Sequence, residues 1–158
     1  MCFNNRAALL ESLPDERLTA SDSYSQNHLP PRSRLSTVTE GYLQDAWAVI
    51  ADDPQPWIQA DFEDIIQIEQ VELRPRSEHE QWVTSFKLAV STDGSTFDFL
   101  LAQNGEERVF KGPTGMSDFV TKTLNSTRAR YIRLYPLTHY VHASLKWEVY
   151  GCIDGTFI

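Results

Sequence analysis

The chain has 158 residues, of which 41% are hydrophobic and 23% are charged, and its formal net charge at pH 7 is −8. This length favours a single domain, which we expect to occupy residues 1–158 with its core between residues 2 and 152. The negative charge argues against nucleic acid as a partner and against simple electrostatic docking on anionic lipid, because both require a basic surface. The sequence contains no apolar run of about 18 residues, the length that a membrane-spanning helix needs.

The first half of the chain predicts short strands separated by one long polar loop. Residues 3–17 are mixed and polar and predict an irregular turn, and residues 18–21 predict a short strand. Residues 23–43 are rich in Ser, Pro and Asn without helical periodicity, and such a long loop in a compact domain commonly carries function. Apolar alternation then predicts strands at 45–49, 57–62 and 65–73, with turns at 52–56 and 63–64 and a bulge in the last strand.

The second half continues the same pattern. A charged loop at 74–81 precedes two strands, 83–91 and 97–101, which an Asp-Gly turn joins as a hairpin. Further strands are predicted at 107–111, 120–124, 131–135 and 145–150, with a turn at 125–129. Pro136 has no N–H to donate, so we expect it to end its strand and to begin a loop over 137–143. About eight short strands without a helix predict an antiparallel all-β sandwich or barrel.

The aromatic and sulfur-containing residues indicate a core and a constraint. Trp47, Trp57, Trp82 and Trp147 each lie in an apolar strand pattern, so we expect them in the core. Cys2 and Cys152 lie near opposite ends, and their number and spacing fit neither a disulfide-dense miniprotein nor a metal site. A bridge between them would stabilise the fold by up to about 5 kcal/mol in the chain-entropy model. The alternative is two free buried thiols in a cytosolic protein.

The sequence contains no catalytic motif that we recognise. It has no HExxH, no GxSxG and no glycine-rich phosphate loop. Asp52 and Asp53 are neighbours in a predicted turn, and adjacent carboxylates seldom converge on one substrate bond. We therefore interpret the chain as a binding module rather than an enzyme.

Four stretches, in chain order, resemble the discoidin family, which includes the C-type domains of coagulation factors V and VIII. They are LTASDSY (18–24), PQPWIQADF (54–62), EQWVTSFKLAVSTDG (80–94) and ARYIRLYPLTHYVHASLKWEVYGC (129–152). The resemblance implies a jelly-roll β-barrel sandwich of the galactose-binding-domain type, with its ends joined by a Cys2–Cys152 disulfide. The loop sequences EQWVTSF and PLTHYVHASL are most similar to those of the discoidin lectins.

The resemblance also places three loops, 24–35, 74–82 and 137–142, at one end of the barrel, where ligands bind in this family. Their polar and aromatic side chains, with one from the nearby segment 45–47, are the candidate ligand-binding residues: Asn27, His28, Asp45, Arg74, Arg76, Glu78, His79, His139, Tyr140 and His142. Such groups bond sugar hydroxyls, and imidazole or aromatic rings cover apolar sugar faces. The alternative to ligand binding is that the second loop carries a solvated charge cluster and that the histidine of the third loop caps a turn.

Arg76 and His142 match an arginine and a histidine in the corresponding loops of the discoidin lectins. We expect Arg76 to be an exposed loop arginine and the best single choice for a ligand contact, because its guanidinium offers five fixed donors. The sequence departs from the family pattern after Val71, where the common Thr-Gln-Gly is replaced by Arg74-Pro75-Arg76. The identity of the ligand therefore does not follow from the resemblance.

We expect a secreted, extracellular recognition or adhesion module, part of a larger multidomain or oligomeric protein, that binds a glycan or a protein. The alternative is a peripheral binder of anionic phospholipid, which family members achieve with large apolar loop residues. That alternative is weaker, because the first loop offers only Leu29 and two prolines. We expect no cofactor; folds of this type often hold a structural calcium ion, but no oxygen-rich cluster is visible and no metal is assigned. The sequon at Asn125 fits a secreted protein.

Overall fold

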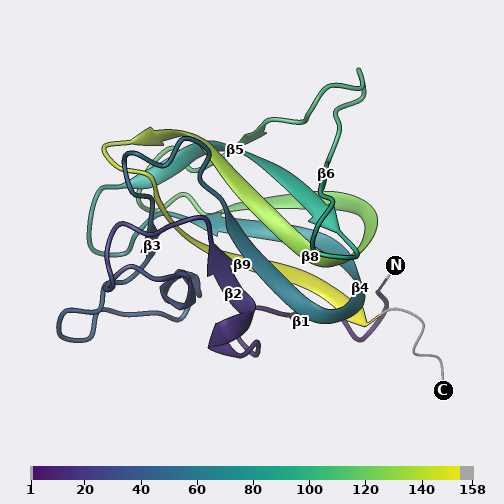
Figure 1. Ribbon diagram of the computed structural model, residues 1–158, viewed down its shortest axis with the longest axis horizontal. Coiled ribbons are helices and arrows are strands. Elements are labelled where there is room, and N and C mark those ends of the chain that lie inside the picture. Colours follow the sequence, from purple (N-terminus) through teal and green to yellow (C-terminus); the bar gives the residue numbers. More distant parts are fainter. Residues whose placement is uncertain (1, 154–158) are drawn as a thin grey trace.

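The computed structural model describes residues 2–153, apart from the side chain of Ser126, and forms an antiparallel β-sandwich (Figure 1). Its strands are β1 (Ala7–Ala8), β2 (Leu18–Ala20), β3 (Trp47–Ala48), β4 (Ile58–Arg74), β5 (Trp82–Ser91), β6 (Asp98–Phe99), β7 (Phe110–Lys111), β8 (Val120–Tyr140) and β9 (Ser144–Ile153). Two 3₁₀ turns, η1 (Asp15–Arg17) and η2 (Pro30–Ser33), are the only helical elements among the described residues.

Two long strands, β4 and β8, pair with each other along both halves of the sandwich. One half has the strand order β1-β9-β4-β8, and the other has β2-β4-β8-β5, with β6 and β7 both paired to β5. Every pair of these strands is antiparallel, as is the pairing of β3 with β9. The predicted all-β antiparallel fold is therefore confirmed.

The turn predicted at 63–64 is wrong, because β4 continues through it as a kinked strand. Glu63 takes a positive φ of 70°, and the register of β4 against β8 shifts between Asp61 and Ile66. The Asp61 carboxylate fixes this kink by accepting hydrogen bonds from the Glu63 amide at 2.8 Å and from Arg130 at 2.8 Å. A bulge in a continuous strand has therefore replaced a reversal of the chain.

The strand breaks predicted in β8 are wrong for the same reason. Residues 127–129 of the predicted turn pair with β4, and the register shift between Ile68 and Gln70 absorbs the extra residues. Pro136 pairs with Phe86 at a register shift in the pairing of β5 with β8. The shift accommodates the missing N–H of the proline, and β8 continues to Tyr140. The third loop is thus shorter than predicted, and the hairpin turns at Val141, which has a φ of 63°.

Three of the four tryptophans lie in the core, as predicted. Trp47 and Trp147 are completely buried and Trp82 nearly so. Trp57 is the exception, because it is half-buried and its ring packs under the Arg133 guanidinium at 3.9 Å. The next residue, Ile58, points into the core instead, so the alternation of the strand places Trp57 on the outer face.

The polar face of β9 is buried as well as its apolar face. Leu145 and Trp147 face the core, and the alternating Ser144, Lys146 and Glu148 are each at most 5% exposed. Residues of the N-terminal segment and of the long first loop lie over this second face, since Glu148 accepts the amide of Leu10 and Lys146 donates to the carbonyl of Thr37. The loop is therefore packed onto the sheet rather than free in solvent.

Three cations hold the irregular first loop in place by donating to backbone carbonyls. Lys146 Nζ donates to the carbonyl of Thr37 at 2.6 Å, and Arg32 Nε donates to that of Gln44 at 2.7 Å. Arg34 donates to two carbonyls of the N-terminal segment, at 2.9 and 2.5 Å. These bonds satisfy carbonyls that a helix or sheet would otherwise satisfy.

The predicted disulfide between Cys2 and Cys152 is confirmed. Their Cα atoms are 5.8 Å apart, and β1 pairs with the end of β9 at Ala7 and Gly151. The bridge closes a loop with a sequence separation of 150, which in the chain-entropy model stabilises the fold by about 5 kcal/mol.

A buried carboxyl group, Glu148, lies under the N-terminal segment. Its Oε1 accepts hydrogen bonds from the amides of Leu10 at 2.6 Å and Val149 at 2.8 Å, while Oε2 has no partner in the described part of the chain. Burial raises the pKa of Glu148 above its ordinary 4.5, although the two amides oppose the rise. The folded protein therefore favours the protonated form.

We expect Glu148→Gln to stabilise the protein increasingly as the pH rises above 4.5, the ordinary pKa of this group. A raised folded pKa contributes stability below the unfolded pKa and loses it as the pH rises through the folded pKa, and glutamine removes that loss. At pH 7 the melting temperature should increase by about 2 °C or more, as roughly 1 kcal/mol produces in a domain of this size. Thermal scans from pH 4 to 8 test this, with the exposed Glu16→Gln as control; parallel pH profiles of wild type and Glu148→Gln would contradict it.

Candidate functional site

The candidate site is a pocket among the loops at one end of the sandwich; these loops lie at the left of Figure 1. We call it the mouth pocket; its volume is about 260 Å³ and it is lined by Tyr24, His28, Gln44, Ala48, Arg76, His79, Gln81 and His142. These residues come from the first loop, from β3, from the 75–81 loop and from the β8–β9 turn. The three loops that the family resemblance places at one end of the barrel therefore all contribute residues to this pocket.

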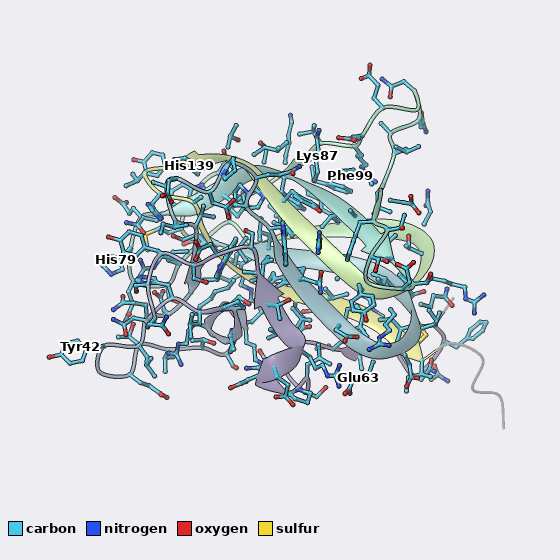
Figure 2. All side chains as sticks on the ribbon, viewed as in Figure 1. Tyr42, Glu63, His79, Lys87, Phe99 and His139 are labelled. Atoms are coloured by element: carbon cyan, nitrogen blue, oxygen red, sulfur yellow. A yellow bond between two sulfur atoms is a disulfide. The ribbon has the colours of Figure 1, made fainter. Side chains whose placement is uncertain are left out.

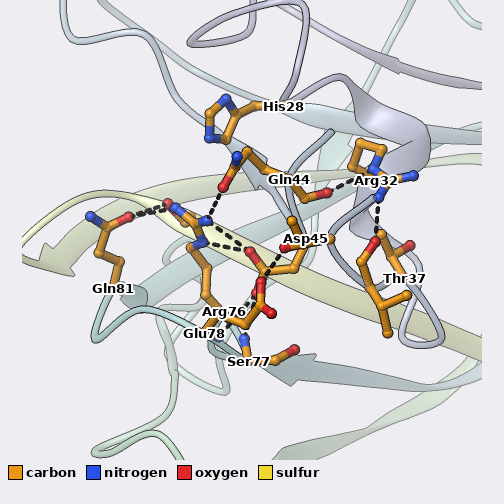
Figure 3. Close-up of polar contacts among 12 residues, drawn as sticks. His28, Arg32, Thr37, Gln44, Asp45, Arg76, Ser77, Glu78 and Gln81 are labelled. Carbon is orange, nitrogen blue, oxygen red and sulfur yellow. Dashed lines mark hydrogen bonds and ion pairs between the residues drawn. The ribbon is translucent and has the colours of Figure 1, made fainter. Parts of the chain in front are cut away.

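A buried ion pair between Asp45 and Arg76 lies beneath the mouth pocket (Figure 3). Arg76 Nε donates to Asp45 Oδ1 at 2.9 Å, NH2 donates to Gln44 Oε1 at 2.9 Å, and NH1 donates to Gln81 Oε1 at 3.0 Å. The other carboxylate oxygen of Asp45 accepts the amide of Ser77 at 2.7 Å. One ion pair thus joins the end of the first loop to both sides of the second.

The expectation that Arg76 is an exposed loop arginine is wrong. Only 5% of Arg76 is exposed, and Asp45 is completely buried. Burial alone would raise the pKa of Asp45, but its hydrogen bond to Arg76, the charge of Arg76 and the Ser77 amide together hold the pKa below its ordinary value. Asp45 is therefore ionised at neutral pH and neutralises the one arginine in the pocket.

Three aromatic or imidazole rings in the pocket lining contact one another. The Tyr24 ring contacts His28 and His142 edge-on, with centroids 5.2 and 5.3 Å apart. His142 Nε2 lies 2.8 Å from the carbonyl of Val49, which only accepts, so Nε2 carries the hydrogen and Nδ1 is an acceptor in the neutral ring. Burial, and then the nearby Arg76 charge, lowers the pKa of His28, which keeps it neutral at pH 7.

The mouth pocket gathers four of the predicted ligand residues, His28, Arg76, His79 and His142. His79 is exposed at the tip of the second loop, at the left edge of Figure 2.

The other predicted ligand residues lie beside the pocket or away from it. Asp45 lies beneath it and acts through Arg76, whereas Glu78 points to Thr39 on the first loop. Asn27 is half-buried, and its carbonyl accepts the amide of Gln44 at 2.9 Å.

Three predicted residues belong to the strands. Arg74 is the last residue of β4, and its guanidinium lies 4.4 Å from the centroid of the Phe119 ring. Tyr140 stacks on Trp82 with centroids 4.6 Å apart, at the end of β8. His139 is exposed on β8 and lines a different cavity.

Sequence reasoning did not select Tyr24, Gln44 and Gln81 as ligand residues. Tyr24 stands at the end of LTASDSY, and Gln81 belongs to EQWVTSF, so both lie inside stretches that carry the family resemblance. Gln44 immediately precedes Asp45 and shares its partner, Arg76. Their positions in or beside the family-like stretches could have identified these residues, whereas their chemical types could not.

The described residues contain no group of three or more His, Cys, Asp or Glu side chains arranged to hold a metal ion. Within residues 2–153, no helix is long and apolar enough to cross a membrane.

Comparison with known proteins agrees with this architecture. The model of the F5/8 type C domain family matches residues 17–149. Lactadherin of Rattus norvegicus is 29% identical over 150 residues, which are 89% of this chain and 34% of lactadherin. Hemocytin of Bombyx mori is 27% identical over 145 residues, which are 91% of this chain but 5% of hemocytin. The chain therefore spans a minor part of the length of these relatives.

Solved structures show the same fold. Discoidin II of Dictyostelium discoideum superposes with a TM-score of 0.82 at 24% identity, covering 96% of this chain and 61% of discoidin II. A Clostridium perfringens module, solved in complex with GalNAc-β-1,3-galactose, superposes with a TM-score of 0.68 at 21% identity, covering 90% of this chain and 99% of the module.

The architecture is an antiparallel β-sandwich with a polar pocket among its loops, and the family match specifies which class of domain this is. The chain belongs to the F5/8 type C, or discoidin, domain family.

Removing either member of the buried ion pair should destabilise the protein strongly. We expect Arg76→Ala or Asp45→Ala to lower the free energy of unfolding by about 3–5 kcal/mol, because each leaves an uncompensated buried charge. The double variant should lose less than the sum of the two single losses. Urea unfolding measures all three; single losses below about 1 kcal/mol, the range of exposed ion pairs, would show that the pair does not organise the loops.

Proposed function

We propose that this domain is a non-catalytic extracellular recognition module that binds a glycan in the mouth pocket. The observation that carries the proposal is the neutralisation of Arg76 by Asp45, which leaves a pocket lined by hydrogen-bonding groups without an uncompensated arginine. A strongly charged ligand would find no uncompensated arginine there, whereas sugar hydroxyls both donate and accept hydrogen bonds.

The pocket supplies donors and acceptors in fixed directions. Gln81 Oε1 accepts from Arg76 at 3.0 Å, which orients its NH₂ group as a donor. His142 offers Nδ1 as an acceptor, because its Nε2 hydrogen is held by the carbonyl of Val49. Tyr24 adds an aromatic surface that is 56% exposed and suits the apolar face of a sugar ring.

The comparisons support the same ligand class. The solved modules with this fold include a Clostridium perfringens module in complex with GalNAc-β-1,3-galactose. The disulfide supports an extracellular location, because such bonds persist in oxidising compartments. The partial coverage of lactadherin and hemocytin supports a role as one module of a longer protein.

Binding to anionic phospholipid is the second candidate function, and one observation favours it. Between Tyr24 and Leu35 the first loop offers only Leu29 and two prolines as apolar groups, but Val38 and Tyr42, in the following part of the same long segment, are 62% and 86% exposed. Tyr42 lies at the far left of Figure 2. Glu40 and Glu78 are exposed beside this part of the segment, and their charge opposes an anionic surface, so we place this function second.

Tyr24→Ala should weaken glycan binding about tenfold, a loss of ~1.4 kcal/mol, because it removes the aromatic surface of the mouth pocket. The fold should survive, because the Tyr24 side chain is largely exposed and the variant keeps the hydrogen bond from the backbone amide of residue 24 to the carbonyl of Ala48. A glycan array identifies the ligand, and titration calorimetry with that glycan measures the loss.

Tyr42→Ala separates the two candidate functions. It should leave glycan affinity at the wild-type level, since Tyr42 does not line the mouth pocket. Co-sedimentation with phosphatidylserine vesicles at physiological salt provides the other arm. Strong vesicle binding that Tyr42→Ala abolishes, together with no bound glycan, would overturn the proposed function in favour of the second candidate.

A further inference from the structure

A second cavity, of about 530 Å³, lies beside the mouth pocket on the outer face of the sheet. We call it the side groove, and the residues that matter here are Lys87, Phe99, Glu107, Pro136, Leu137 and His139. One wall is the 51–56 loop, the other is formed by Phe99 and Glu107, and the floor is the outer face of β8. In Figure 2, Lys87 and Phe99 lie together along the upper edge, with His139 nearer the loop end.

The walls of the side groove are tied together by a stack of side chains. The Arg133 guanidinium lies 3.9 Å from the centroid of the Trp57 ring and 3.8 Å from that of the Phe97 ring. Trp57 is the residue after the 51–56 loop of the first wall, and Phe97 is two residues before Phe99 of the second wall. Arg133 also donates to Tyr135, a buried residue of the groove lining, at 3.3 Å. These contacts fix the width of the groove before any ligand arrives, which reduces the entropy cost of binding.

The groove is apolar at its floor, and its rim carries one ion pair together with the carboxylate of Asp53. Pro136, Leu137 and Phe99 supply apolar surface, while Lys87 Nζ and Glu107 Oε1 form an ion pair at 2.8 Å. Both members of the pair remain partly exposed, so they keep donors and acceptors for a ligand. This combination fits an uncharged, polyhydroxylated ligand with apolar faces, and it gives no excess charge to attract an anion.

One residue, His142, belongs to both cavities. It lines the mouth pocket and the side groove, and its bond to the carbonyl of Val49 holds it between them. The amide of Val49 in turn donates to the carbonyl of Ala143 at 2.9 Å. Hydrogen bonds therefore hold Val49, His142 and Ala143 together between the two cavities. A ligand seated in the mouth pocket and extended over His142 would enter the side groove.

We propose that the side groove is an extension subsite for a further sugar unit of an oligosaccharide whose end sits in the mouth pocket. This inference rests on the proposed function, and it specifies the ligand class as an oligosaccharide rather than a single sugar. The chemistry of the two cavities is complementary to successive sugar rings: hydroxyl-binding groups in the mouth pocket, and an apolar floor with a polar rim in the side groove.

The test compares oligosaccharides with their own terminal sugars. A panel of immobilised glycans, each ending in galactose, N-acetylgalactosamine or fucose and presented as a monosaccharide and as di- to tetrasaccharides, identifies the best-bound oligosaccharide. Calorimetry then measures the ratio of its affinity to that of its terminal monosaccharide. We expect a ratio of about ten in the unmodified protein, which corresponds to ~1.4 kcal/mol. The double variant Lys87→Ala with Glu107→Ala should bring the ratio close to one, and Lys111→Ala, on β7 outside the groove, should retain it.

Two outcomes would overturn the side groove alone: a ratio of about one in the unmodified protein, or a full ratio in the double variant. Failure of every glycan on the panel to bind would overturn the proposed function, and the groove inference with it. Amide chemical shifts provide a second readout that does not depend on a variant. Leu137 and Phe99 should shift with the oligosaccharide but not with the monosaccharide, and the absence of that difference would also overturn the inference.

Discussion

The loop end of this domain depends on one buried ion pair. Asp45 and Arg76 come from two segments that are 31 positions apart in the chain, and the carboxylate also accepts a hydrogen bond from the amide of Ser77. An arginine without this partner would be a costly buried charge, and a loop without it would lose its anchor. The same pair sets the chemistry of the pocket, because it neutralises Arg76 and turns Gln44 and Gln81 toward fixed orientations. The same ion pair therefore holds the loops together and determines the chemistry of the pocket.

The remaining order of the loops comes from the sheet beneath them. Lys146 projects from β9 and donates to the carbonyl of Thr37, so a strand directly clamps the first loop. Arg32 clamps the same loop internally by donating to the carbonyl of Gln44, next to Asp45. Because these cations serve backbone carbonyls, they are unavailable for an anionic ligand. Several basic residues of the loop end are therefore engaged inside the domain rather than presented on its surface.

The fold followed from local patterns, whereas the site depended on partners distant in sequence. Alternation predicted most strands, and the family-like stretches predicted which loops meet. Alternation could not predict that β4 and β8 continue through a kink at Glu63 and a proline at Pro136, because the kink is fixed by Asp61 together with Arg130, which is 69 positions away from Asp61 in the chain. The burial of Arg76 was missed for the same reason: its partner, Asp45, is separated from it by 31 residues. Charge in a loop sequence does not by itself distinguish a ligand contact from a structural ion pair.

The central claim is that the mouth pocket is preformed by the Asp45 carboxylate, and backbone hydrogen exchange in the ligand-free protein tests it most directly. The Ser77 amide donates to Asp45 at 2.7 Å, whereas the Glu80 amide in the same loop donates to no partner among residues 2–153. The account predicts that Ser77 exchanges far more slowly than Glu80 before any ligand is added. Equally rapid exchange at both amides would contradict it, because it would show that the second loop is not held in place in the free protein.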